Sequence, residues 1–414
     1  MNVKILNDNV TQWLLGTVDI PGDDPEQKPD TYSVQLRFLR SLCAPNYTVF
    51  SNMASQNKWI EDHGQTPESH YVVSLESPHN AIHLAVGGFY QEGEFNAGPI
   101  PGANGDMGDN ETASFDPIFW FHHCFIDYTF SVWQRVSGHT KRGSLTVIRD
   151  YPGTILRTGQ PPNYPRGTQI DMTTPLIPFE KPSGGYYTSD DVTDLNELGI
   201  TYAPGSLDPL FKKRTASSKS PFDLINPEFF DPMELAGLIA GSDPRAENPF
   251  PRTKWVHNID RAQYEGSFVV RLYAKGHDGE EVEMGREAVL SRWNAKKCRN
   301  CQDHLEVVFY VPIDAKTLGV LEGPKKAKIV WRVEVQTRDG RRHTISSPPQ
   351  PKARGPGVKD LMSDGESTMG TMGLMSDGEP TMGTMGLTPN GEPTMGIVAP
   401  MSDGGRGWAM VGDL

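Results

Sequence analysis

The sequence predicts a multidomain α+β protein, and three observations lead to this fold class. Apolar residues recur with helical spacing in the first 200 residues, between loops rich in glycine and proline. Short runs rich in β-branched and aromatic residues follow, and the last 54 residues repeat a 13-residue unit with almost no aromatic residues. We therefore expect a mainly helical domain at 1–225, a linker at 226–249, a β-sandwich at 250–348 and a disordered tail at 349–414.

Four segments of the first domain have the spacing of amphipathic helices. They are residues 9–18, 31–43, 78–86 and 117–138, of which the last is the longest. Two glycines, Gly87 and Gly88, are expected to end the third helix, because glycine readily adopts the left-handed conformation found after helices. Residues 92–110 are rich in glycine and proline, so we expect a loop there.

The β-sandwich is predicted from three runs with strand composition. They are residues 267–275, 305–313 and 328–337. The dipeptides Asp278-Gly279 and Asp339-Gly340 are typical of tight turns between antiparallel strands. Together they indicate a compact domain of about 100 residues.

Composition excludes several classes of protein. The formal charge of −13 argues against a nucleic-acid partner, since such proteins present a basic face. A membrane span is not expected, because no apolar run reaches about 18 residues. Four cysteines are too few for a disulfide-rich secreted scaffold, and the N-terminus lacks the pattern of a secretory signal. These features favour an intracellular, cytoplasmic protein.

Two groups of histidines suggest a metal site. His79 and His83 are four residues apart, so on a helix both imidazoles point from the same face. His122 and His123 lie within an aromatic run that should be buried. Each group alone has a simpler explanation, namely chance spacing on a helix surface or a core histidine bonded to a carbonyl. Three imidazoles from two helices would suit a copper or zinc ion with an open coordination position.

Longer stretches around these histidines resemble the copper-B half of tyrosinases, which are type-3 copper proteins. They are 76–88 (ESPHNAIHLAVGG) and 113–127 (ASFDPIFWFHHCFID), and segments 174–179 and 198–202 are similar to the end of that domain in fungal members. The resemblance implies a four-helix bundle holding two copper ions, covered by a β-sandwich lid at 250–348. It also implies that phenolic substrates and dioxygen react there: monophenols are o-hydroxylated and o-diphenols are oxidised to o-quinones, in melanin-type pigment chemistry.

The resemblance assigns roles residue by residue. It makes His79, His83 and His123 the copper-B ligands, with His122 as a packed neighbour. Phe119 would pack against the site.

Four further residues receive roles from the same motif. Asp127 would bond a ligand imidazole or an arginine. Glu76 would be a base that deprotonates incoming phenols through a water, and Asn80 would position that water. Leu84 would line the substrate entrance.

A copper-A half is not identified in this chain, so one copper site is found where the family has two. The first histidine is His63, and the spacing from His70 to His79 lacks the expected aromatic and arginine context. Either the chain is an incomplete piece of a tyrosinase-like oxidoreductase, or it is a truncated, non-catalytic copper-binding or interaction protein. Without the other helix pair, we expect the apolar faces of both ligand helices to be uncovered, including Ile82, Phe119, Phe121 and Phe125.

Sulfur-containing residues offer further places for copper. Cys298 and Cys301 are two residues apart, a spacing that can hold Cu(I), form a redox disulfide or contribute half a zinc site. Fungal relatives carry a similar pair that is thought to help load copper, and inert surface thiols are the simpler interpretation. The methionines of the tail could also bind Cu(I), but a repeat-expanded spacer is the favoured interpretation.

Overall fold

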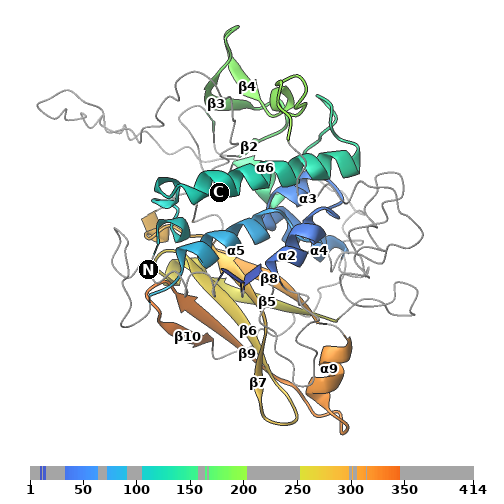
Figure 1. Ribbon diagram of the computed structural model, residues 1–414, viewed down its shortest axis with the longest axis vertical. Coiled ribbons are helices and arrows are strands. Elements are labelled where there is room, and N and C mark those ends of the chain that lie inside the picture. The colour runs from blue at the N-terminus through green and yellow to red at the C-terminus, as the bar shows by residue number, and fades with distance from the viewer. Residues whose placement is uncertain are drawn as a thin grey trace, which may run out of the picture. The chain divides into compact units, whose positions relative to one another are not determined.

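The computed structural model describes residues 10–11, 13–14, 33–63, 72–90, 105–156, 164–165, 167–202, 252–297, 301, 305–313 and 315–345. Residues 1–350 form a first compact unit, which is separate from residues 351–414. The first unit is α+β, as predicted, with most helices before the strands (Figure 1). The predicted linker at 226–249 and tail at 349–414 lie outside the described residues.

The helices confirm three of the four predicted segments, at 31–43, 78–86 and 117–138, and add others. Most of the predicted segment at 9–18 lies outside the described residues. The helices are α2 (Val34–Ser41), α3 (Tyr47–Ser51), α4 (Met53–His63), α5 (Glu76–Gly87), α6 (Ile118–Ser137) and α9 (Ala315–Glu322). Helix α5 ends at the predicted glycines, and Gly88 has a φ of 68°. Gly138 ends α6 in the left-handed conformation with a φ of 76°. Helices α3, α4 and α9 were not predicted. Helix α3 has only five residues, too few to show a helical period, and the polar residues of α4 hide its spacing.

The strands form two larger antiparallel sheets and two short hairpins. The strands are β1 (Ile155–Leu156), β2 (Thr168–Gln169), β3 (Pro175–Glu180), β4 (Tyr186–Thr188), β5 (Arg252–Asp260), β6 (Phe268–Lys275), β7 (Glu281–Val289), β8 (Glu306–Ile313), β9 (Val330–Thr337) and β10 (Arg342–Ile345). The four-stranded sheet has the order β10-β9-β6-β7, and β5 pairs with β8. The three predicted strands correspond to β6, β8 and β9, while β5, β7 and β10 were not predicted.

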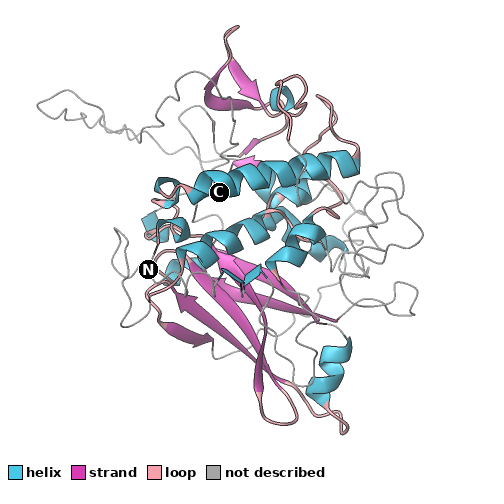
Figure 2. Cartoon of the chain, viewed as in Figure 1, coloured by secondary structure: helices cyan, strands magenta, loops and turns pink. Residues whose placement is uncertain are grey.

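Two hydrophobic cores hold this unit together. One lies between the sheets and contains inward-facing residues of β5, β6, β8 and β9, among them Val270, Phe309 and Val335. The other gathers residues of α2, α5 and α6, and it also includes Val269 of β6 and Ala288 of β7. Figure 2 shows the helices gathered beside the strands. Since side chains of the four-stranded sheet enter the helical core, the helices and this sheet share apolar packing.

A buried ion pair adds to this contact between the helices and the sheet. Arg37 of α2 lies 3.1 Å from the carboxylate of Glu287 in β7, and both side chains are at most 3% exposed. Ser77 of α5 donates its hydroxyl to Glu287 and accepts from Arg37 at 2.9 Å. The charge cluster therefore links α2, α5 and β7.

The expectation of uncovered apolar faces is partly confirmed. Phe121 is 72% exposed at the start of α6, beside exposed Trp120 and Ile118. Phe125 was predicted to be uncovered, but it packs edge-on against Phe38 of α2, with ring centroids 5.1 Å apart. Ile82 likewise packs against the helical core. Helix α2 therefore covers part of the face that the sequence left open.

None of the helices in the described part of the chain has the length and apolar character needed to cross a membrane.

Candidate metal centre

Three imidazoles converge between helices α5 and α6. His79 and His83 lie one turn apart on α5, and His123 comes from α6. Their Nε2 atoms form a nearly equilateral triangle: His79 and His83 are 3.2 Å apart, and each is 3.4 Å from His123. A point equidistant from three atoms so spaced lies about 1.9 Å from each, close to the 2.0–2.1 Å typical of metal–imidazole bonds. The donor set therefore fits one transition-metal ion.

The two imidazoles on α5 are held in the tautomer that ligation requires. The Nδ1 of His79 donates to the side-chain oxygen of Asn80 at 2.8 Å. The Nδ1 of His83 donates to the backbone carbonyl of Met107 at 2.7 Å. Because each Nδ1 carries the proton, each Nε2 presents a lone pair to the centre.

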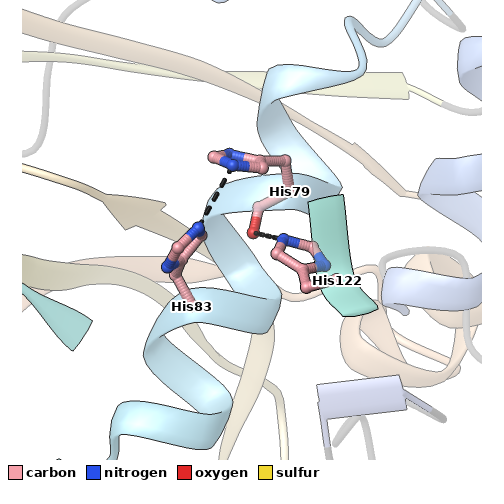
Figure 3. A group of neighbouring side chains, drawn as sticks. All are labelled: His79, His83 and His122. Carbon is pink, nitrogen blue, oxygen red and sulfur yellow. Dashed lines mark hydrogen bonds between the residues drawn. The ribbon is translucent and has the colours of Figure 1, made fainter. Parts of the chain in front are cut away.

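His122 offers a second grouping with the same two partners. The ligand atoms of His79, His83 and His122 lie within 4.8 Å of one another (Figure 3). However, the Nε2 of His122 donates to the backbone carbonyl of His79 at 3.2 Å, so this nitrogen already joins the two helices. The tighter triangle favours His123 as the third ligand, with His122 as the neighbour that the sequence predicted.

Burial keeps these imidazoles neutral. It lowers the pKa of His79 well below the usual value, that of His83 to about 4 and that of His122 to about 2. Neighbouring imidazoles lower these pKa values further, because two nearby positive charges repel each other. The pKa of His123 is also lowered by burial. Since metals bind the neutral form, the site is ready for ligation at neutral pH.

This protonation state makes the metal-free protein sensitive to acid. The folded-state pKa values of His83 and His122 lie below the unfolded value of 6.5, so their neutral forms stabilise the fold fully above pH 6.5. As pH falls from 6.5 towards 4, the unfolded chain takes up protons that the folded chain does not. We expect the free energy of unfolding to fall by up to about 1.4 kcal/mol per pH unit for each imidazole, measured by urea unfolding. In the variant His122→Gln, the free energy of unfolding should depend less steeply on pH than in the parent. An equal pH dependence in the two proteins would contradict the lowered pKa assigned to His122.

Two other predicted residues lie near the centre in different ways. Phe119 stacks on the ring of His123 with centroids 4.1 Å apart. Asp127 is one helical turn beyond His123, and burial raises the pKa of its carboxyl to about 6. Among the described residues, none forms a hydrogen bond or ion pair with the carboxylate of Asp127. The predicted bond from Asp127 to a ligand imidazole or an arginine is not seen among the described residues and stays a prediction.

The site and its surroundings match one protein family. Residues 15–136, which include both ligand helices except the last residue of α6, match the common central domain of tyrosinase. A tyrosinase of Hahella sp. (HcTyr2) is 39% identical over 335 residues, which cover 78% of this chain and 54% of the relative. The chain belongs to the tyrosinase family of type-3 copper proteins.

Other tyrosinases support the same assignment. The tyrosinase of Aspergillus oryzae is 38% identical over 324 residues, covering 75% of this chain and 54% of the relative. The tyrosinase structure from Burkholderia thailandensis at low pH has a TM-score of 0.59 and 40% identity, covering 82% of this chain and 58% of that one. The chain spans about half the length of the curated relatives it matches. Since these relatives include bacterial proteins, the resemblance to fungal members was drawn too narrowly.

The predicted base and its positioner lie next to each other in this tyrosinase-family site. Glu76 accepts the backbone N–H of Met53 at 2.7 Å, and the Asn80 amide nitrogen lies 3.5 Å from its other oxygen. Burial raises the pKa of Glu76, while the Met53 bond, Arg261 and Asn80 act in the opposite direction. Asn80 therefore connects the carboxylate to the ring of His79.

Several features differ from the sequence expectations or were missed. Leu84 was predicted at the substrate entrance, but it is completely buried in the helical core. Cys301 is disulfide-bonded, so in this state it has no thiolate for loading Cu(I), and Cys298 lies outside the described residues. The carbonyl of Met107 was missed as the partner of His83, because a backbone group leaves no signal in the sequence.

Proposed function

We propose that the chain holds one copper ion through His79, His83 and His123, and that this ion belongs to a phenol-oxidising centre of the tyrosinase type. The observation that supports it best is the Nε2 triangle with sides of 3.2–3.4 Å, whose centre fits a metal bound by imidazoles. Imidazole ligands suit copper, and three of them leave a coordination position open. The family assignment favours copper over zinc.

A bound copper ion would supply one-electron redox chemistry with dioxygen. The residues of the chain orient the ligands and handle protons. Asn80 and the Met107 carbonyl keep the two α5 imidazoles in the ligating tautomer. Glu76 is the proposed proton acceptor for a phenol, because burial raises the pKa of this carboxyl towards the range useful for a base.

The finer features of the reaction and the fold are part of this proposal. The substrates are monophenols, which are o-hydroxylated, and o-diphenols, which are oxidised to o-quinones, as in melanin-type pigment formation. The helices α5 and α6 would form half of a four-helix bundle around two copper ions. The sandwich at 250–348 would act as a lid, which is supported by the packing of Val269 and Ala288 into the helical core.

A second candidate is a copper-binding protein without oxidase activity. Within the described ranges, the cluster of histidines on α5 and α6 is the one place where three metal-ligating side chains gather. Reduction of dioxygen by a type-3 centre needs two electrons and therefore two copper ions. This observation favours a chain that binds one copper and requires other residues for catalysis.

Copper stoichiometry combined with oxygen uptake tests both candidates. We expect the 414-residue chain to bind one Cu per chain and to form negligible o-quinone from a catechol. The variant His79→Ala should bind none. Two coppers per chain with oxygen-dependent quinone formation would contradict the one-site proposal, and no copper bound by the parent would overturn the metal assignment itself.

A further inference from the structure

A buried arginine from the β-sheet half of the unit, residues 252–345, contacts the C-terminal end of the ligand helix α5. Arg338 follows β9 at the turn into β10, and its side chain is completely buried. Its Nε donates to the carbonyl of Gly88 at 3.2 Å, and its Nη2 donates to the carbonyls of Gly87 at 3.1 Å and Gly105 at 2.7 Å. Burial of a guanidinium is costly unless its N–H groups are satisfied. In Arg338 these three bonds satisfy Nε and Nη2, whereas Nη1 has no hydrogen-bond partner among the described residues.

The guanidinium of Arg338 lies at the C-terminal end of α5, where backbone carbonyls require hydrogen-bond donors. The last carbonyls of α5 have no partners inside the helix, and this helix end carries partial negative charge. Close backbone packing surrounds the arginine: a β-carbon on Gly87 would collide with the backbone of Gly108, and one on Gly108 would collide with Arg338. Arg338 therefore joins the C-terminal end of α5 to the segment 105–109.

The same short segment orients a proposed metal ligand. Met107, in the middle of the segment, is completely buried. Its backbone carbonyl accepts a hydrogen bond from the Nδ1–H of His83. Arg338 holds the carbonyl of Gly105 on one side of it. On the other side, Asp109 accepts the indole N–H of Trp293 and lies 3.9 Å from Nη1 of Arg338. Both ends of the segment are thus held by residues that follow β7 or β9.

We propose that Arg338 is a positioning residue for His83. By holding Gly105 against the end of α5, it keeps the Met107 carbonyl within hydrogen-bond distance of the imidazole. The β-sheet half then supports metal binding from within the fold, besides covering the site. This inference rests on the proposed function, because it assumes that His83 is a metal ligand.

The variant Arg338→Met tests this role in the full chain. It keeps a long side chain but removes all the donors to Gly87, Gly88 and Gly105. We expect the affinity for Zn(II), measured by competition with a chromogenic chelator, to fall about 10- to 100-fold, as is typical when the partner of a ligand is lost. The visible spectrum of bound Co(II) should also change, because the orientation of one imidazole is altered.

Two further variants separate positioning from general stability. Arg341→Met is the matched control, because this arginine lies in the same turn and its side chain is 64% exposed. It should bind Zn(II) like the parent. Arg338→Lys retains the charge but cannot reach all three carbonyls, so we expect an intermediate affinity and a folded protein. Parental Zn(II) affinity and Co(II) spectrum in Arg338→Lys or Arg338→Met, even with a lower melting temperature, would overturn the proposal. Failure of the parent to bind Zn(II) would instead overturn the proposed function.

Discussion

Replacing His123 with alanine is expected to remove specific metal binding while the protein stays folded. The substitution deletes one corner of the Nε2 triangle, whose sides to His79 and His83 are both 3.4 Å. Loss of a residue that only hydrogen-bonds to a metal ligand can lower metal affinity by about 100-fold, so loss of the ligand itself should lower it at least as much. Isothermal titration with Zn(II) or Cu(II) measures the change. Because His123 is only partly buried, the free energy of unfolding should change little.

The neighbouring histidine provides the matched control for this experiment. His122→Gln removes a buried ring that bonds the carbonyl of His79, and glutamine can donate to the same carbonyl. We expect this variant to lose stability but to bind metal within a few-fold of the parent. If His122→Gln abolished binding and His123→Ala did not, the wider group of His79, His83 and His122 would be the metal site.

Replacing Glu287 with alanine is expected to destabilise the fold by about 3–5 kcal/mol. The change leaves Arg37 buried without this carboxylate and removes the acceptor of the Ser77 hydroxyl. Removing one partner of a buried pair is costly because the other charge stays out of water. Urea unfolding at neutral pH measures the effect.

Glu281→Ala is the control for the buried pair. This residue begins the same strand, and its ion pair with Arg332 is partly exposed. A surface pair contributes at most about 1 kcal/mol, so this variant should be close to the parent. If Glu287→Ala and Glu281→Ala lowered the free energy of unfolding equally, Glu287 would contribute no more to stability than a surface charge.

The sequence was most informative where side chains repeat at short spacing. His79 and His83 are one helical turn apart, and the motif around His123 is long, so the ligand helices could be predicted. Strand β7 was missed because its charged residues, such as Glu283 and Arg286, pair with one another in partly buried positions. That pairing depends on neighbouring strands and has no local signal.

The residues that support the centre were harder to predict than the ligands. The role of Asn80 in positioning a water stays a prediction, and the bond that its side-chain oxygen accepts from His79 was not expected. The partner of His83 is a backbone carbonyl, and backbone groups are the same in every residue. Arg338 is distant in sequence from the helix it contacts, so no spacing rule could connect them. Such partners become visible only when the fold brings them together.

The distance along the chain between these partners has a consequence for biosynthesis. Arg37 and Glu287 are 250 residues apart, and Gly87 and Arg338 are 251 apart. At about 5–20 residues per second, the ribosome needs about 12–50 s to make the chain between them. During that interval Arg37 of α2 lacks its contact with Glu287, and the C-terminal end of α5 lacks the donors of Arg338. We therefore expect the helical segment to complete its packing only after the last strands have left the ribosome.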